Sequence, residues 1–168
     1  MKKHVPFLMC AVLVLLLPSA LVWSERPPDP TFSDFPAKKV SIKKIAKPDV
    51  SKERARTYRT RLREGAAKGP NFAGHYTVVR WGCGTDCIEF AIVDAISGTV
   101  FFPPFLTVQS VPPYDQDNPT MIPRNVEFRP DSRLLIVTGT IDKSSSDKHF
   151  YEWTGKELKL VLAYKLRP

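Results

Sequence analysis

The sequence is poor in the residues that most often carry out chemistry. Its 168 residues include three cysteines and three histidines, and one of each lies in the first ten residues. No Gly-x-Ser-x-Gly motif marks a serine nucleophile, and neither His75 nor His149 has a neighbouring Ser or Cys motif. Each histidine is more typical of a strand residue with a satisfied ring than of a catalyst. We therefore expect no catalytic residues and no cofactor, which favours a protein that is not an enzyme.

Long apolar runs are missing from most of the chain. The one long run, residues 8–17, follows a basic N-terminus and has the length of a signal-peptide core rather than of a membrane span. Pro18 interrupts it, and residues 22–24 offer small residues to a signal peptidase. These features predict a signal peptide over residues 1–24, with cleavage before Glu25. An uncleaved anchor is the alternative.

The remainder of the chain contains no further segment able to span a bilayer. Because of the predicted signal peptide, we expect an exported protein that is periplasmic or secreted. Its length suits one hydrophobic core. The composition predicts an extended leader rich in proline and lysine over residues 25–48 and a single α+β domain over residues 49–168. No feature of the sequence specifies an oligomeric state.

Cys83 and Cys87 lie in a glycine-rich turn. Export places them in an oxidising compartment, so we predict that they form a disulfide bond. Their C-x-x-x-C spacing differs from the redox motif C-x-x-C. A zinc ion would need about four ligands, and only His75 is near in sequence. We interpret the pair as structural and expect no metal, with a redox or metal role as the alternatives.

A helix is predicted over residues 50–67, because four apolar residues recur on one narrow face. Asp49 or Ser51 is the expected N-cap, and Gly65 is the first of the residues expected to end the helix. The apolar face consists of Ala55, Tyr58, Leu62 and Ala66.

The rest of the chain predicts an antiparallel β-meander of about seven strands, with short connections. Its shape is a curved sheet or a small sandwich, with the helix against one face. Residues 40–45 are a candidate edge strand, and residues 103–123 are expected to form a long proline-rich loop. Phe101 to Phe105 either pack into the core or leave an exposed apolar patch. The predicted strands are 75–81, 89–94, 99–102, 125–128, 133–141, 148–153 and 157–164.

Positive charge is concentrated in one segment. Residues 38–68 contain twelve basic residues against three acidic ones. They either dock on an acidic part of the same domain or form a contact surface for an anionic partner. The partner would be an envelope protein or an anionic envelope polymer. Nucleic acid is not expected, because the chain is predicted to be exported and has no recognisable reader module. The candidate surface comprises Arg54, Arg56, Arg59, Arg61, Arg63, His75, Trp81 and Asp86.

The leading functional hypothesis is therefore a non-enzymatic binding module of the bacterial envelope, similar in size and character to inhibitors and immunity proteins. One alternative is an envelope hydrolase that uses His75 or His149 with a carboxylate such as Asp86 or Glu89. A third hypothesis is a structural protein that associates with anionic surfaces through its basic segment.

Several short motifs resemble a group of small exported bacterial proteins of unassigned function. They are Asn-Phe-Ala-Gly-His-Tyr at 71–76, Trp-Gly-Cys-Gly at 81–84 with Cys87, and later elements such as Tyr-Glu-Trp-Thr-Gly at 151–155. The resemblance covers about residues 58–162. It implies a bacterial, exported protein of one domain, and it brings no activity or catalytic residue.

Overall fold

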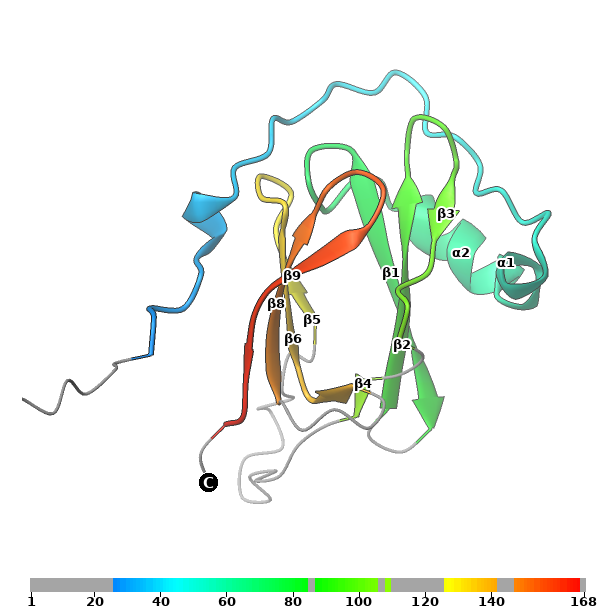
Figure 1. The fold of residues 1–168 in the computed structure, drawn as a ribbon. Helices are drawn as coiled ribbons and strands as arrows, with labels where there is room; N and C mark the ends of the chain where they lie inside the picture. The colour runs from blue at the N-terminus through cyan, green and yellow to red at the C-terminus, as the bar shows by residue number, and fades with distance from the viewer. Residues whose placement is uncertain (1–25, 85–86, 106–107, 110–125, 142–146, 167–168) are drawn as a thin grey trace, which may run out of the picture.

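The computed structural model describes residues 26–84, 87–105, 108–109, 126–141 and 147–166. Two antiparallel sheets lie face to face, and two short helices pack on the outer face of the first sheet (Figure 1). The predicted α+β antiparallel fold is confirmed. Of the two shapes left open, the protein adopts the small sandwich.

The first sheet is built on a hairpin of β1 (Tyr76–Gly84) and β2 (Cys87–Asp94). Its register pairs Tyr76 with Asp94 at one end and Gly84 with Cys87 at the other. Two short strands, β3 (Val100–Phe101) and β4 (Val108–Gln109), pair with β2 at different points along its length. β4 also pairs with β7 (Thr140–Ile141), so the sheet has the order β1-β2-β4-β7. The prediction missed β4, because it lies inside a proline-rich stretch.

The second sheet has the order β5-β6-β8-β9. Its strands are β5 (Val126–Phe128), β6 (Leu134–Thr138), β8 (Lys148–Trp153) and β9 (Leu158–Tyr164). The single strand predicted over residues 133–141 is wrong. Gly139, with a φ of +140°, divides it, and the second piece, β7, pairs in the first sheet. A positive φ of this kind is readily adopted only by glycine, so Gly139 lets the chain pass from one sheet to the other.

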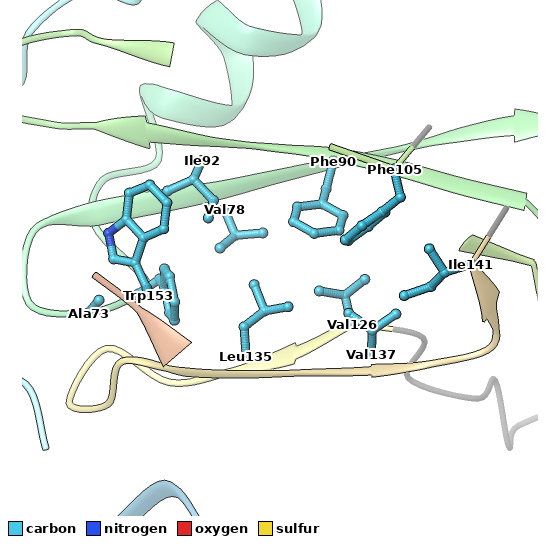
Figure 2. Close-up of a cluster of buried hydrophobic side chains, with 11 residues drawn as sticks. Ala73, Val78, Phe90, Ile92, Phe105, Val126, Leu135, Val137, Ile141 and Trp153 are labelled. Atoms are coloured by element: carbon cyan, nitrogen blue, oxygen red, sulfur yellow. The ribbon is translucent and has the colours of Figure 1, made fainter. Parts of the chain in front are cut away.

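The main core lies between the two sheets. Phe90 and Phe105 from the first sheet's side meet Val126, Leu135 and Val137 of the second (Figure 2). Strand alternation sends Val78 into this core and Val79 to the opposite face, against the helices. Both faces of β1 are therefore covered by apolar layers.

The predicted helix is two helices, α1 (Glu53–Thr57) and α2 (Arg59–Ala66), which meet at Tyr58 (φ −99°, ψ 18°). The predicted apolar face is confirmed, because Ala55, Leu62 and Ala66 are buried against the first sheet.

Two predictions about the helix ends are wrong. Lys52 is at the N-cap position, and Asp49 instead accepts a hydrogen bond from the Ser51 amide (2.9 Å) in the turn before α1. Gly65 lies inside α2, where a Cβ would collide with the Val79 side chain. Gly65 therefore permits close helix–sheet contact rather than ending the helix.

The aromatic run after β3 leaves no exposed patch. Phe101 packs toward the core between the sheets, and Phe102 packs toward the helices, 6.2 Å from the Tyr58 ring. Phe105 is buried in the main core. Consecutive residues point to opposite faces, and here both faces are covered.

The N-terminal segment, residues 26–48, is extended and crosses from the second sheet to the helices (Figure 1). The segment contains a short 3-10 helix, η1 (Phe32–Asp34). Phe32 in this helix and Phe35 directly after it cover the outer face of the second sheet. The segment bonds to both sheets: Arg133 donates its amide to the Phe35 carbonyl (2.8 Å), and Ala46 donates to the Ala95 carbonyl (2.9 Å). It thus packs along the sandwich as a fourth layer.

The edge strand predicted at residues 40–45 is not formed. The Val40 amide donates to the Gly74 carbonyl at 3.3 Å, which is a single contact with a turn. Lysines interrupt this stretch, and no neighbouring strand runs alongside it in the described residues.

The Asn71-Phe72-Ala73-Gly74 motif forms the tight turn that leads into β1. The Asn71 side chain accepts from the Val78 amide (2.8 Å) and donates to the Val78 carbonyl (3.2 Å), as a neighbouring strand would. Ala73 (φ +45°) and Gly74 (φ +88°) turn the chain, and the Gly74 amide donates to the Pro130 carbonyl in the second sheet's β5–β6 turn (2.8 Å). The motif therefore joins the two sheets and has a structural role.

Gly98 tests whether the N-terminal segment contributes to stability. Its φ is +80°, and a Cβ there would overlap the Lys47 carbonyl oxygen of the segment. We expect Gly98→Ala to lower the free energy of unfolding by about 1–3 kcal/mol for the strained φ and by about 1–3 kcal/mol more for the displaced segment. Urea denaturation followed by circular dichroism measures the total loss in the free energy of unfolding.

The control is Gly69→Ala, because Gly69 has a similar φ (+90°) but a Cβ there would make only an ordinary contact, 3.7 Å from Ile45 Cδ1. Gly69→Ala should show the cost of the φ alone. Equal losses in the two variants would mean that the segment adds nothing to the stability of the sandwich.

Candidate functional site

The outward side of the two helices carries four exposed arginines, which we call the basic face: Arg56, Arg59, Arg61 and Arg63. Among the described residues, none of the four lies within ion-pair distance of a carboxylate. The ion pairs found there are His75–Asp94, Arg133–Glu152 and Lys148–Asp29. The described residues thus give no support to the interpretation that the basic helix docks on an acidic part of its own domain.

The arginines face outward because the other side of each helix is needed for the core. Ala55, Leu62 and Ala66 occupy the buried side, and the first sheet leaves no room there for a charged group. Arg54 is the exception among the predicted arginines: it is half-buried, with its guanidinium 4.5 Å from the centre of the Phe102 ring. Such a cation–π contact supports helix packing, so Arg54 contributes less to the free surface.

A groove runs beside the basic face, between α2 and residues 45–48 of the N-terminal segment. Its volume is about 680 Å³, with an apolar floor that includes Ile45 and Ala66, and Lys47 and Arg63 line it. The sequence prediction missed this groove, because it treated residues 40–45 as an edge strand and did not place them beside the helix. The closely spaced lysines of residues 38–47 were the sequence signal that this segment could add positive charge beside the helix.

A smaller groove of about 280 Å³ lies on the other side of α2. Three cations, Arg61, Lys68 and Arg80, line it with one acid, Glu64. Arg80 was not predicted to belong to the site, because it is in β1 and its part in the surface depends on where α2 packs. Cationic grooves therefore flank α2 on both sides.

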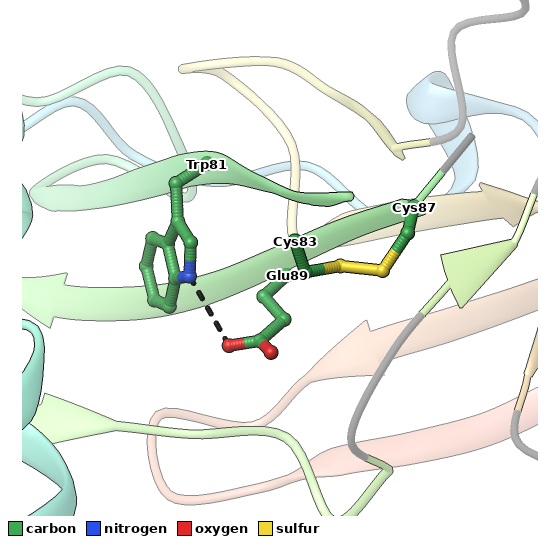
Figure 3. The surroundings of a disulfide bond; sticks show 4 residues. All are labelled: Trp81, Cys83, Cys87 and Glu89. Atoms are coloured by element: carbon green, nitrogen blue, oxygen red, sulfur yellow. Dashed lines mark hydrogen bonds between the residues drawn. A yellow bond between two sulfur atoms is a disulfide. The ribbon is translucent and has the colours of Figure 1, made fainter. Parts of the chain in front are cut away.

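The tip of the β1–β2 hairpin holds the predicted disulfide bond between Cys83 and Cys87 (Figure 3). The prediction of this bond is confirmed. Gly82, Cys83 and Gly84 are exposed there. Asp86, which was predicted to join the binding surface, lies outside the described residues.

Trp81 is not part of an exposed surface, so that prediction is wrong. It is 7% exposed, and its ring packs 4.6 Å from the Tyr58 ring beneath the helices. Its indole Nε1 donates to Glu89 Oε2 at 3.1 Å (Figure 3). A hydrogen bond with the same Glu89 carboxylate raises the pKa of Tyr58. Glu89 thus binds two aromatic side chains of the helix–sheet layer and is not available to a histidine.

His75 lies at the opposite end of the hairpin from the disulfide. Its Nε2 is 3.8 Å from Asp94 Oδ1, and its ring centre is 4.1 Å from that of Tyr76. The Asp94 carboxylate already accepts hydrogen bonds from the Ile96 amide (2.8 Å) and the Ser97 hydroxyl (2.8 Å). The Ser97 hydroxyl therefore binds the carboxylate rather than the histidine. The predicted partners of His75 were Asp86 and Glu89, and Glu89 is near the other end of β2.

His149 is a packed residue of β8, 4% exposed. Burial lowers the pKa of its ring, against the opposing effects of the nearby Asp147 carboxylate and a backbone hydrogen bond with Val137. The ring lies parallel to Tyr151, with centres 6.2 Å apart. It is enclosed in the second sheet and presents no face to a substrate.

The predicted site residues fall into three separate places. The basic face lies over the outer side of the first sheet. His75 comes directly before the nine-residue strand β1, and the disulfide lies at the far end of that strand. At about 3.3 Å per residue, those ends are roughly 25 Å apart. Within the described residues, no three His, Cys, Asp or Glu side chains come together in a way that could hold a metal ion. The basic face with its two grooves is the largest of the three places.

The buried His149 predicts a pH dependence of stability. Because its pKa is lowered by folding, the unfolded chain, whose histidine titrates near pH 6.5, binds protons more readily than the folded protein. The free energy of unfolding should therefore fall as the pH drops from 7 to 5. Urea titrations at several pH values measure the fall, and His149→Gln should reduce it. A fall of the same size in the variant would contradict the role of His149.

Comparison with known proteins identifies no relative. No protein-family model, no curated protein and no solved structure was found to match this chain. What the protein does is therefore inferred from its own residues and their geometry.

Proposed function

We propose that this protein is an exported, non-enzymatic binding module of the bacterial envelope, and that its basic face binds an anionic envelope partner. The partner is an acidic protein or an anionic polymer. The observation that carries the proposal is that Arg56, Arg59, Arg61 and Arg63 are exposed and have no carboxylate partner among the described residues.

The crowding of these arginines carries a cost to the fold that an anionic partner would relieve. Like charges crowded on two short helices repel one another, and none of the four arginines offsets this with an ion pair in the described residues. Arg56 and Arg59 donate instead to backbone carbonyls, of Ser51 (2.7 Å) and Arg56 (3.3 Å). An arginine stays charged at any physiological pH, and its planar fork matches a carboxylate or a phosphate.

The two grooves beside α2 give the surface a shape as well as a charge. The larger one combines an apolar floor with Lys47 and Arg63. An acidic partner with an apolar side chain or segment would bury that side chain in the groove while its charges meet the arginines. This combination favours one specific partner over loose adsorption to any anionic surface.

Export rests on the predicted signal peptide and is consistent with the disulfide at the hairpin tip. In the part of the chain that the structure describes, neither helix has the length and apolar character that crossing a bilayer would require. Residues 1–24 lie outside that part.

The hydrolase alternative is retained on one observation, the approach of His75 to Asp94 at 3.8 Å. It would need a nucleophile or an activated water beside His75. Turnover of an envelope substrate that is lost in His75→Gln and kept in Arg59→Gln/Arg63→Gln would favour this alternative over the binding module.

The binding proposal is tested with Arg59→Gln/Arg63→Gln. Both residues are exposed on α2, so the fold should be retained. The tagged protein is incubated with solubilised envelope and, separately, with vesicles of phosphatidylglycerol or phosphatidylcholine. We expect retention of an acidic envelope component to fall by about tenfold or more, because each lost charge-assisted contact is worth about 1.5–3 kcal/mol.

The matched control is Lys159→Gln/Lys165→Gln, which removes the same two charges from exposed positions in or next to β9. It should bind like the unaltered protein. Equal losses in both variants, with binding only to phosphatidylglycerol and only at low salt, would mean that net charge alone causes adsorption. That result would favour the surface-associating structural protein over a specific binding module.

A further inference from the structure

A cavity of about 370 Å³ lies away from the basic face, where the β2–β3 turn, the β8–β9 turn and the start of α1 come together. We call it the turn cleft. The side chains that matter for its chemistry are Lys52, Tyr76, Asp94, Thr99, Trp153 and Lys156. Its volume falls within the range of small-molecule sites, which combine an apolar lining with a few placed polar groups.

The first unusual feature of the cleft is the indole N–H of Trp153. The residue is 3% exposed, and Nε1 itself is closed off from solvent. Burial raises the pKa of the neighbouring Tyr76 hydroxyl, and a side-chain hydrogen bond with Trp153 opposes that rise. Figure 2 shows the indole nitrogen pointing away from the other side chains of the main core. Buried donors are nearly always paired, and the Tyr76 hydroxyl is the partner beside this one, so the hydroxyl is the group of the pair that a ligand can meet.

The second feature is a hydroxyl next to this N–H. Tyr76 and Trp153 pack edge to face with ring centres 5.2 Å apart, and the centre of the Phe101 ring lies 5.0 Å from that of Trp153. At Gly155 a Cβ would lie 3.4 Å from the Tyr76 hydroxyl oxygen. The absence of a side chain at Gly155 leaves the approach to this hydroxyl open, and the aromatic rings give the cleft a wall suited to a ring-shaped ligand.

The third feature is an excess of positive charge at the rim. Lys52 and Lys156 are exposed, come from different elements and line the same cavity. The one acid in the lining, Asp94, is engaged with the Ile96 amide and the Ser97 hydroxyl. These hydrogen bonds leave the charge of Asp94 in place, so the lining carries two cations against one anion, and this excess of positive charge favours an anionic ligand.

We propose that the turn cleft binds a small ring-shaped carboxylate, of the class of the hexuronic acids. The carboxylate meets Lys52 and Lys156, the ring lies against the aromatic wall beside Trp153, and its hydroxyls pair with the Tyr76 hydroxyl and Thr99. The site is distinct from the basic face, so it stands or falls independently of the proposed envelope partner.

The chain contains three tryptophans, so the indole N–H region of a nitrogen–proton NMR spectrum is simple to read. Trp153→Phe and Trp81→Phe assign the two relevant signals. We expect glucuronate to shift the Trp153 signal in a saturable way and to leave the Trp81 signal in place, because Trp81 donates to Glu89 beneath the helices. Glucose, which has the same ring without the carboxylate, should bind about tenfold more weakly or worse.

Lys52→Gln/Lys156→Gln should weaken glucuronate binding by about tenfold while the Trp81 signal shows an unchanged fold. Lys159→Gln/Lys165→Gln should bind as the unaltered protein does. The proposal is overturned if millimolar glucuronate leaves the Trp153 signal unmoved, if glucose binds equally well, or if the Lys52/Lys156 variant keeps full affinity. Glucose 6-phosphate binding more tightly than glucuronate would also overturn it, by making phosphate the preferred group.

Discussion

Burial of the β1–β2 hairpin on both faces is the constraint on which the rest of the structure depends. Val78 and Val79 are neighbours in β1, yet one lies in the core between the sheets and the other lies against the helices. A strand of this kind has no polar face, so each side must be covered by another apolar layer. The second sheet covers one side. In the part of the chain that the structure describes, the two short helices cover the other.

The need to cover the outer side of the first sheet also determines where the arginines of the helices lie. The buried side of α1 and α2 is apolar, and Gly65 lets α2 approach Val79 closely. The remaining sides of such short helices carry the arginines, which leaves them in solvent. Residues 26–48 then cross the sandwich and bring Lys47 to the edge of α2. The basic face and its larger groove thus follow from covering one sheet, and the turn cleft forms where the sandwich opens beside Trp153.

The sequence predicted what depends on local periodicity. The alternating residues of β1, the apolar face at Ala55, Leu62 and Ala66, and β8 were all identified from spacing. It missed what depends on contacts between distant segments. Trp81 looked like a surface aromatic, because nothing in the sequence shows that Tyr58 and Glu89 enclose it. Gly139 looked like a residue within one strand, because a change of sheet leaves no periodic signal. The cavities could not be predicted, since each forms between segments that are distant in sequence.

Site-specific photo-cross-linking tests the central claim, that the basic face is the surface that binds, most directly. A benzophenone side chain is placed at Thr60, which is exposed among the arginines of α2, or at Leu160, which is 53% exposed on β9. Each protein is irradiated in the presence of solubilised envelope. If the basic face binds, one acidic envelope component is cross-linked from position 60 and none from position 160. Cross-links to a single component from position 160 alone would rule out the basic face and would move the binding surface to the second sheet.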